Sequence, residues 1–346
     1  MLRIGNLKTG GVAMSEQKIQ PDIFYQIRNG TRGAAAMLAG MKLDIFTPLK
    51  DGAMSPQQLA LKLGVNPKKL APLLYTLVLT GLLTEKEGAF SNTPETDKYL
   101  VKGRAEYMGN VHKIWYSNLM ATLKTAETIR SGIPQAEYDW KNMTKDELWV
   151  LYEGMAAPDT IFANKLSTTF DFSENRRLLD AGGGSGTLAI AMTKIHPQLT
   201  ATVFDLPTVT PITEQFIRDL EASERVRVVS GDLTCDPIPG KYDVAFLGSV
   251  IQTLSAEEAR LVIINVGKVI KPGGHLYIFG SGMLNNSRLS PKAAVEFNLV
   301  FISTYDNGQS YTENEYTNWL KAAGFIDLDF RYNEFTINAR KSADKK

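Results

Sequence analysis

Leu178-Leu179-Asp180-Ala181-Gly182-Gly183-Gly184-Ser185-Gly186 is the stretch that decides the fold. An apolar run ends in an acid, glycines follow at alternate positions, and segment 187–194 is compatible with a helix. This order predicts a buried strand, a tight turn and a helix start. Glycines let the backbone pass close to a ligand, and free N–H groups at a helix N-terminus favour polar or anionic groups. The spacing differs from the dinucleotide-binding G-x-G-x-x-G, which would need glycine at Thr187.

Three further strands are predicted downstream, and each leads to residues suited to a ligand. The strands and their following residues are 200–204 with Asp205, 226–229 with Gly231-Asp232-Leu233, and 242–247 with Gly248-Ser249. Ligands in open α/β sheets bind outside the carboxyl ends of the strands, where Asp205 is placed to accept hydrogen bonds from two ribose hydroxyls. Each acid alone would also suit an ordinary helix N-cap. The set together suits a nucleoside that lacks a pyrophosphate.

These motifs resemble those of class I S-adenosylmethionine (SAM)-dependent methyltransferases. More narrowly, they are similar to those of the O-methyltransferase family of plant caffeate and bacterial polyketide-tailoring enzymes. The segments that carry the resemblance are 180–186, Phe204-Asp205-Leu206-Pro207, Gly231-Asp232 and Lys271-Pro272-Gly273-Gly274. The resemblance runs from about Phe24 to Ala339, and it is specific to the family but not to a substrate. It implies SAM as the cofactor, bound by Asp180, Gly182, Gly184, Asp205, Leu206, Asp232, Leu233 and Gly248.

Strands and helices alternate from Arg176 onward, which predicts a doubly wound α/β sheet. Strand one is expected over about 177–181. The later elements are a helix over 256–269, a strand over 275–279, helices over 291–302 and 312–323, and strands over 326–332 and 335–339 joined by a tight turn. Methyltransferases of this class show such a terminal antiparallel pair after five parallel strands. The expected fold class is therefore α/β, with a Rossmann-like seven-stranded methyltransferase sheet behind an all-α, winged-helix N-terminal domain.

The N-terminal part predicts helices followed by a hairpin. The expected elements are two helices over 22–45 divided near Gly30, a helix from Ser55-Pro56 to Leu63, a helix over 67–80 and a hairpin over 82–91. This order is that of a winged helix, which could bind DNA. The third helix, however, carries Lys68 and Lys69 before a largely apolar run, so phosphate and base contacts are sparse. In the resembled family this module is a dimerisation domain, which implies a homodimer and no nucleic acid.

Two helical stretches, 106–130 and 146–170, connect the two parts. A core stripe explains most of their apolar residues. In the resembled family these helices form the lid and much of the acceptor pocket, and the residues that this implies here are His112, Trp115, Tyr152, Met155 and Phe162. His112 would equally suit a core position with its hydrogen bonds satisfied. The expected organisation is a disordered N-terminus (1–20), a winged-helix dimerisation domain (21–104), connecting lid helices (105–170) and a SAM-binding catalytic domain (171–340).

Composition limits the function classes. A chain of 346 residues favours two domains, and 38 Lys+Arg against 37 Asp+Glu argue against a dedicated nucleic-acid binder. The single cysteine, Cys235, and three widely separated histidines predict no disulfide and no metal site. No apolar run reaches the roughly 18 residues of a membrane span, and no signal peptide is found. A cytoplasmic location is expected, with Met14 as a second candidate start beside Met1.

The catalytic segment departs from the family pattern. Methyl transfer is an in-line displacement that the protein assists mostly by positioning and desolvation, but a weakly acidic acceptor such as a phenol also needs a base. O-methylating relatives supply a histidine from a Leu-His-Asp-Trp segment, where this chain has Gln252, which cannot act as a base. Ser310 replaces the glutamate that orients this histidine. Gly248 replaces a lysine that touches the cofactor in plant members.

These departures leave three outcomes open. The acceptor needs no strong base, or another residue such as His112 or Tyr311 is the base, or the fold serves a SAM-dependent reaction other than methyl transfer. The expected function is methyl transfer to a small aromatic or polyketide-like metabolite of secondary metabolism. The alternatives are a SAM-dependent decarboxylase, hydroxylase or cyclase in which Gln252 orients the acceptor, and a winged-helix DNA-binding regulator. The sequence does not fix whether O, N, C or S is methylated.

Overall fold

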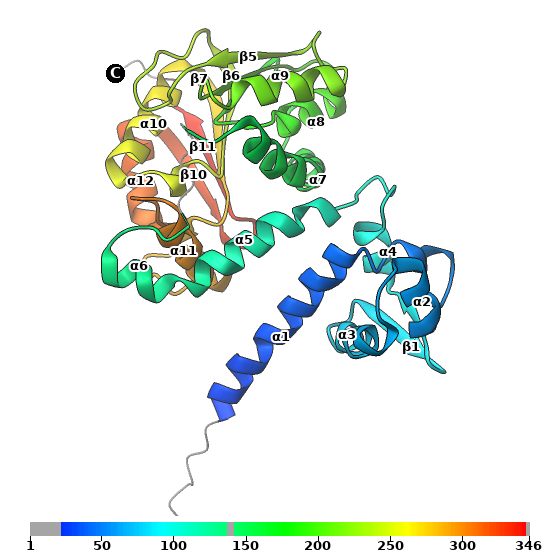
Figure 1. Cartoon of the computed structure of the whole chain (residues 1–346). Coiled ribbons are helices and arrows are strands. Elements are labelled where there is room, and N and C mark those ends of the chain that lie inside the picture. The colour runs from blue at the N-terminus through cyan, green and yellow to red at the C-terminus, as the bar shows by residue number, and fades with distance from the viewer. Residues whose placement is uncertain (1–21, 137–141, 344–346) are drawn as a thin grey trace, which may run out of the picture.

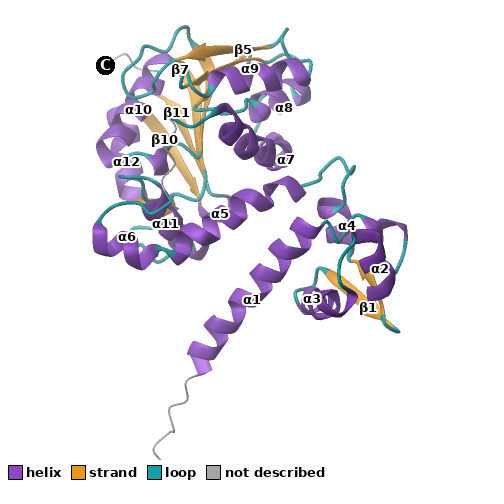
Figure 2. Cartoon of the chain, in the orientation of Figure 1, coloured by secondary structure: helices purple, strands orange, loops and turns teal. Residues whose placement is uncertain are grey.

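The computed structural model describes residues 22–136 and 142–343, so the N-terminus expected to be disordered lies outside the described residues. A seven-stranded sheet organises the C-terminal half (Figures 1 and 2), in the order β10-β11-β7-β6-β3-β4-β5. Its strands are β3 (Arg177–Ala181), β4 (Thr200–Asp205), β5 (Val226–Ser230), β6 (Tyr242–Gly248), β7 (Ile270–Phe279), β10 (Phe325–Arg331) and β11 (Thr336–Lys341). Strands β3 to β7 are parallel, and β11 runs antiparallel to both of its neighbours. The expected fold class is confirmed.

Both faces of the sheet are buried, because successive strand residues point to opposite sides. Leu179 belongs to a core shared with α10 and α12, and Leu178 belongs to a core shared with α7 and α8. The helices of this half are α8 (Thr187–Ile195), α9 (Thr210–Asp219), α10 (Ala256–Val269), α11 (Lys292–Thr304) and α12 (Glu313–Ala322). The carboxyl ends of the parallel strands border the cavity described in the next subsection.

The later strands differ from the prediction in three details. Strand β7 begins at Ile270, so the Lys271–Gly274 motif lies within the strand, beside a register shift in its pairing with β6. A short helix, η4 (Tyr332–Glu334), joins β10 to β11 in place of a tight turn. A two-residue parallel pair, β8 (Met283–Leu284) with β9 (Tyr311–Thr312), was not expected.

The N-terminal part folds as helices and a hairpin around its own core, which includes Leu59, Leu74 and Phe90. Its elements are α1 (Asp22–Leu43), η1 (Pro48–Asp51), α2 (Pro56–Leu63), α3 (Pro67–Leu79), β1 (Leu83–Lys86), β2 (Ala89–Asn92) and α4 (Pro94–Leu100). A capping box between Ser55 and Gln58 starts α2, as its sequence predicts. Helix α1 projects away from this core (Figure 1).

The predicted division of the first helix near Gly30 is wrong, because α1 is continuous from Asp22 to Leu43. A Cβ at Gly30 would meet no atom within 4 Å, so this glycine serves no packing need. One exposed glycine costs a helix about 1 kcal/mol relative to alanine. That cost is too small to end a helix of 22 residues.

The connecting segment crosses between the two parts (Figure 1) as η2 (Gly109–Val111), α5 (His112–Leu123), α6 (Thr125–Ser131) and α7 (Lys145–Thr169). The stretch expected to be one helix over 106–130 is divided at Lys124, where the backbone leaves helical geometry at φ −95° and ψ 8°. Helix α7 agrees with the prediction and starts at a capping box of Thr144 and Glu147. None of the helices in the described ranges has the length and apolarity that crossing a membrane requires.

Candidate active site

A cavity of about 690 Å³ lies at the carboxyl ends of the parallel strands, a size typical of small-molecule sites. One side is formed by the turns after β3, β4, β5 and β6. The other side is formed by α5, α7, α11 and the segment 305–307. The predicted site residues that line it are Asp180, Gly182, Gly184, Asp205, Leu206, Asp232, Leu233, Gly248, Gln252, Trp115, Tyr152 and Met155.

The glycine turn after β3 needs glycine for both conformation and space. Gly182 and Gly184 have φ values of +71° and +56°, in the left-handed region. A Cβ at Gly184 would lie 2.3 Å from Cε1 of Tyr152, and one at Gly182 would lie 2.4 Å from Cγ2 of Val250. The ring of Tyr152, from α7, therefore packs directly on the backbone of the turn.

Asp205 lies at the end of β4 and connects this strand to the glycine turn. One carboxylate oxygen accepts the N–H of Gly184 at 2.7 Å, and the other accepts the N–H of Leu206 at 2.7 Å. The residue is 9% exposed and lines the cavity, away from bulk solvent. Burial raises the pKa of its carboxyl to about 6, against the two N–H donors, which lower it.

Asp180, at the end of β3, presents an unpartnered oxygen. The residue is 2% exposed, and its Oδ2 has no hydrogen-bond partner among the described residues. This oxygen would lie 2.7 Å from a Cβ at Gly183, so it points along the glycine turn. Burial, and then the carboxylates of Asp159 and Asp205, raise the pKa of Asp180 to about 8. An unpaired buried carboxylate oxygen is costly, and a cationic ligand group would pair it.

Asp159 is a cavity residue that the sequence prediction missed. It lies on α7 and accepts a hydrogen bond from the hydroxyl of Thr187 at the start of α8. It keeps some exposed surface because it faces the cavity, yet the surrounding protein desolvates it and raises its pKa to about 6. Tyr152, Met155 and Asp159 follow one another at spacings of three and four, one face of a helix. That spacing is the signal that could have identified Asp159.

Two cofactor candidates near β5 and β6 also have structural roles. Oδ1 of Asp232 accepts the N–H of Thr234 at 2.9 Å and its hydroxyl at 2.6 Å, as an Asx turn does. A Cβ at Gly248 would lie 2.4 Å from the ring of Phe279. Glycine is therefore required at this position by the neighbouring aromatic ring.

Gln252 lies in the short helix η3 (Ile251–Thr253), is 5% exposed and lines the cavity. Three glycines make room for it. A Cβ at Gly280 would lie 2.9 Å from its Nε2, one at Gly282 would lie 2.6 Å from its Cβ, and one at Gly308 would lie 2.7 Å from its carbonyl oxygen. The side chain is thus held closely against the 280–282 turn, while Gly308 packs on the backbone of Gln252.

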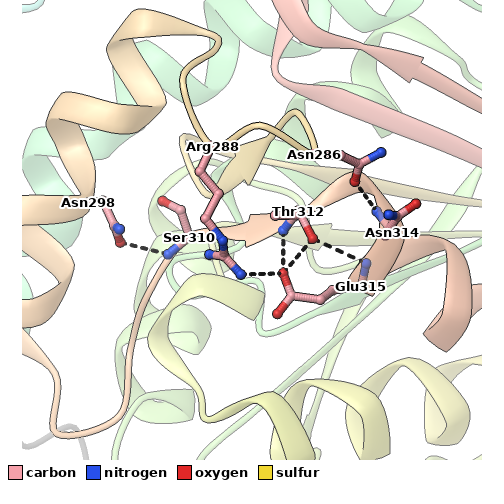
Figure 3. Close-up of polar contacts among 7 residues, drawn as sticks. All are labelled: Asn286, Arg288, Asn298, Ser310, Thr312, Asn314 and Glu315. Atoms are coloured by element: carbon pink, nitrogen blue, oxygen red, sulfur yellow. Dashed lines mark hydrogen bonds and ion pairs between the residues drawn. The ribbon is translucent and has the colours of Figure 1, made fainter.

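Ser310 lies in a segment that three separate sets of hydrogen bonds hold after the cavity (Figure 3). Its N–H donates to Oδ1 of Asn298, on α11, at 2.7 Å. One oxygen of Glu315 accepts the N–H of Thr312 at 2.7 Å, its hydroxyl at 2.6 Å and the guanidinium of Arg288 at 3.3 Å. The backbone at Ser310, where the sequence resemblance places an orienting glutamate, is therefore held by an asparagine on α11.

His112 and Phe162 do not line the cavity, contrary to expectation. Nδ1 of His112 lies 2.8 Å from the carbonyl oxygen of Gly109, so the ring belongs to the η2–α5 junction. The ring of Phe162 packs on Phe279 with centroids 4.6 Å apart, in the core beneath the sheet. Tyr311, the other candidate base, is buried and donates its hydroxyl to the carbonyl of Leu254, and burial raises its pKa to about 12. Neither His112 nor Tyr311 is placed as a base.

Comparison with known families accounts for most of the chain. Residues 126–326 match the O-methyltransferase domain, and residues 25–102 match the O-methyltransferase dimerisation domain. The two matches follow the division between the sheet half and the N-terminal half.

Individual relatives agree with the family. The chain is 27% identical over 314 residues to the tetracenomycin polyketide synthesis 8-O-methyl transferase TcmO of Streptomyces glaucescens, covering 89% of this chain and 92% of that protein. It is 23% identical over 346 residues to the L-tyrosine C(3)-methyltransferase of Streptomyces lavendulae, covering 96% and 94%. The crystal structure of human N-acetylserotonin methyltransferase in complex with SAM matches with a TM-score of 0.81 at 22% identity, covering 95% of this chain and 100% of that one.

These comparisons give no support to a non-methylating enzyme or to a DNA-binding regulator. The family match spans more than half of the chain, and the cavity lies where the family's motifs place the cofactor. The chain therefore belongs to the O-methyltransferase family and is a SAM-dependent methyltransferase.

Proposed function

We propose that this methyltransferase acts on a small aromatic, polyketide-like metabolite that binds between α5, α7 and α11. The observation that carries the proposal is the two-sided lining of one cavity. Polar turns and carboxylates form the side at the strand ends. Apolar and aromatic side chains form the other side, among them Ile114, Trp115, Met155, Phe297 and Phe301.

The strand-end side fits SAM. Its glycine turn needs Gly182 and Gly184, because Val250 and Tyr152 fill the space that Cβ atoms there would take, and the turn lines the cavity. The unpartnered oxygen of Asp180 suits a cationic group, and Asp205 lies where a ribose would be held. When bound, SAM supplies an electrophilic methyl group on a positively charged sulfur. The contribution of the protein is to hold the two partners in line and to exclude water.

The helical side fits a flat, apolar acceptor. Large aromatic and methionine side chains stabilise aromatic ligands through area burial and ring contacts. The two relatives described above are named for a polyketide and for tyrosine, which are consistent with an aromatic acceptor. The same two names specify methylation at oxygen and at carbon, so the acceptor atom varies among similar chains.

In this proposal Gln252 does not act as a base; it orients the acceptor. Its amide has both donor and acceptor atoms and no pKa in the working range. Packed against Gly280 and Gly282, the side chain can hold an acceptor hydroxyl or carbonyl in a fixed pose. The acceptor must then lose its proton by its own acidity, which favours hydroxyls of conjugated or electron-poor aromatic rings.

The test is to incubate the full chain with SAM labelled in its methyl group and a panel of hydroxylated aromatic compounds. Product mass should rise by one methylene. Substituting Gln252→Leu removes the amide at nearly constant size, so we expect turnover to fall about 10- to 100-fold while SAM affinity changes less than about two-fold. Unchanged turnover in Q252L would remove the role of Gln252, and a product without an added methyl would refute the activity.

The proposal includes the organisation of the chain. We assign residues 21–104 to a winged-helix dimerisation domain, 105–170 to the lid helices and 171–340 to the catalytic domain. The dimerisation-domain match over 25–102 supports a homodimer through the first of these. The proposal also places the enzyme in the cytoplasm and in secondary metabolism; the name of the polyketide relative supports the second assignment.

A further inference from the structure

We propose that Asp159 on α7 is a further cofactor-binding residue, and that it forms, with Asp180, a receptor for the cationic groups of SAM beside the ribose site at Asp205. The inference rests on the proposed function for the place of SAM in the cavity. It adds to that function a residue from the lid helix and a means of distinguishing the cofactor from its demethylated product, S-adenosylhomocysteine.

The geometry gives each of the three carboxylates a different set of protein partners. Both oxygens of Asp205 accept backbone N–H groups, from Gly184 and from Leu206. Asp159 accepts the hydroxyl of Thr187. Oδ2 of Asp180 has no partner in the described part of the chain. All three aspartates line the same cavity, and Asp159 and Asp205 are close enough to Asp180 for their charges to raise the pKa of its carboxyl.

The charge around this receptor has one sign. Among the described residues that line the cavity, the charged side chains are all acidic: Asp159, Asp180, Asp205, Asp232, Glu258 and Asp306. A cavity lined by one sign of charge, with low-dielectric walls, attracts ions of the opposite sign. SAM and S-adenosylhomocysteine both carry an α-ammonium and an α-carboxylate, and only SAM carries the sulfonium, so only SAM has a net positive charge. The receptor should therefore bind the cofactor more tightly than the product, which would help the product to leave.

The receptor should also exchange protons when it is filled. Burial and mutual repulsion raise the pKa of Asp180 to about 8, and burial raises those of Asp159 and Asp205 to about 6. The neighbouring hydroxyl of Tyr152 stays neutral, because burial and then Asp205 raise its pKa. At pH 7 the empty receptor thus holds a proton, mainly on Asp180, and a cation expels it. SAM affinity is expected to increase as the pH rises from about 6 to about 8.

Calorimetry on the full chain tests this. Binding of SAM and of S-adenosylhomocysteine is measured at pH 7 in two buffers of different ionisation enthalpy, which yields the number of protons released. The wild type should release more protons with SAM than with its product. In Asp159→Asn we expect SAM affinity to fall about ten-fold or more, and the preference for SAM over its product to shrink. Glu153→Gln, on the exposed side of α7, is the matched control and should bind as the wild type does.

A second readout separates binding from folding. Asp159→Asn removes one of several like charges, so the ligand-free variant should not melt below the wild type. Thr187→Val is a further variant: it removes the hydrogen bond that lowers the pKa of Asp159, so SAM binding should need a higher pH. Wild-type SAM affinity and proton release in D159N would overturn the inference, as would a lower melting temperature with equal losses for both ligands. Absence of SAM binding by the wild type would instead refute the proposed function.

Discussion

Asp180 shows how one buried side chain determines the response of the folded chain to pH. Its pKa lies at about 8 in the folded protein, against an ordinary value of 3.8. Between these values the folded state holds a proton that the unfolded chain has lost. Because proton binding and folding are linked, the Asp180 carboxyl contributes its full stabilisation of the folded state below about pH 4. This contribution to the free energy of unfolding is lost as the pH rises through about 8.

The first prediction follows from that window. Without ligand, the Tm of the wild type should fall more steeply between pH 5 and pH 8 than the Tm of Asp180→Asn, because asparagine cannot ionise. Differential scanning calorimetry at four or five pH values measures the two slopes. Asp171→Asn is the control, since Asp171 is exposed and its pKa is lowered, which places its titration below this range. Parallel curves for the wild type and D180N would contradict the assignment.

The sequence predicted site residues correctly where they are adjacent in the chain. It failed for residues that only the folded structure brings together. Asp180 and the glycine turn form one uninterrupted motif, so their proximity to each other is fixed by the chain. Asp159 comes from a helix that precedes the motif, and its role depends on packing against Thr187. His112 was misplaced because helical spacing does not specify which neighbour a side chain meets; here the neighbour is a carbonyl three residues away.

Individual elements were predicted well when their ends carry local signals. Helix α10 has the predicted bounds, and a capping box of Ser255 and Glu258 starts it. The break between α5 and α6 carries no proline or glycine, so no local signal marks it. Strands β8 and β9 have two residues each and exist through pairing across a separation of 28 positions, from Met283 to Tyr311, which periodicity cannot detect.

The contact between α11 and the segment before β9 leads to a second prediction. Asn298→Ala removes the acceptor for the N–H of Ser310, a fully buried residue, so the free energy of unfolding should fall by about 1–3 kcal/mol. The cavity residues 305–307 precede this anchor, so KM for the acceptor should rise while SAM affinity is retained. Urea unfolding and steady-state kinetics measure both effects.

Asn286→Ala is the matched control for this element. Asn286 accepts the N–H of Asn314 at 2.9 Å in the same segment, but that hydrogen bond is exposed (Figure 3). Both stability and KM should stay close to wild type. If N286A and N298A behave alike, the anchor between α11 and Ser310 does not position the cavity residues.

At the scale of the whole molecule, an apolar face is left uncovered by the residues that the structure describes. At the N-terminal end of α1, Ile23, Phe24 and Ile27 are between 61% and 72% exposed, on a helix that projects from its core (Figure 1). Apolar patches of this kind mark interaction surfaces. Ile27 lies inside the dimerisation-domain match, which begins at residue 25, and Ile23 and Phe24 directly precede it, which supports a second copy of the chain as the partner.

The third prediction tests this assembly. Replacing both Phe24 and Ile27 by glutamate places charges in the proposed interface, where each buried apolar side chain contributes about 1.5–3 kcal/mol. Sedimentation equilibrium should report a dimer for the wild type and a monomer for the double variant. Gln26→Glu, a charge on the same helix, should leave the dimer intact. A double variant with the mass of the wild type would contradict dimerisation through α1.

The position of β11 has a consequence for biosynthesis. Strand β11 is the last strand of the sheet in sequence order, yet it lies between β7 and β10. Strand β10 is at the edge of the sheet, and β11 is its only neighbour in the sheet. A nascent chain emerging from the ribosome must therefore wait for residues 336–341 before β10 can join the sheet. Until then β7 has an unpaired edge, the kind of surface that recruits other chains. A premature stop codon before Thr336 should yield aggregated polypeptide, whatever the state of the cavity.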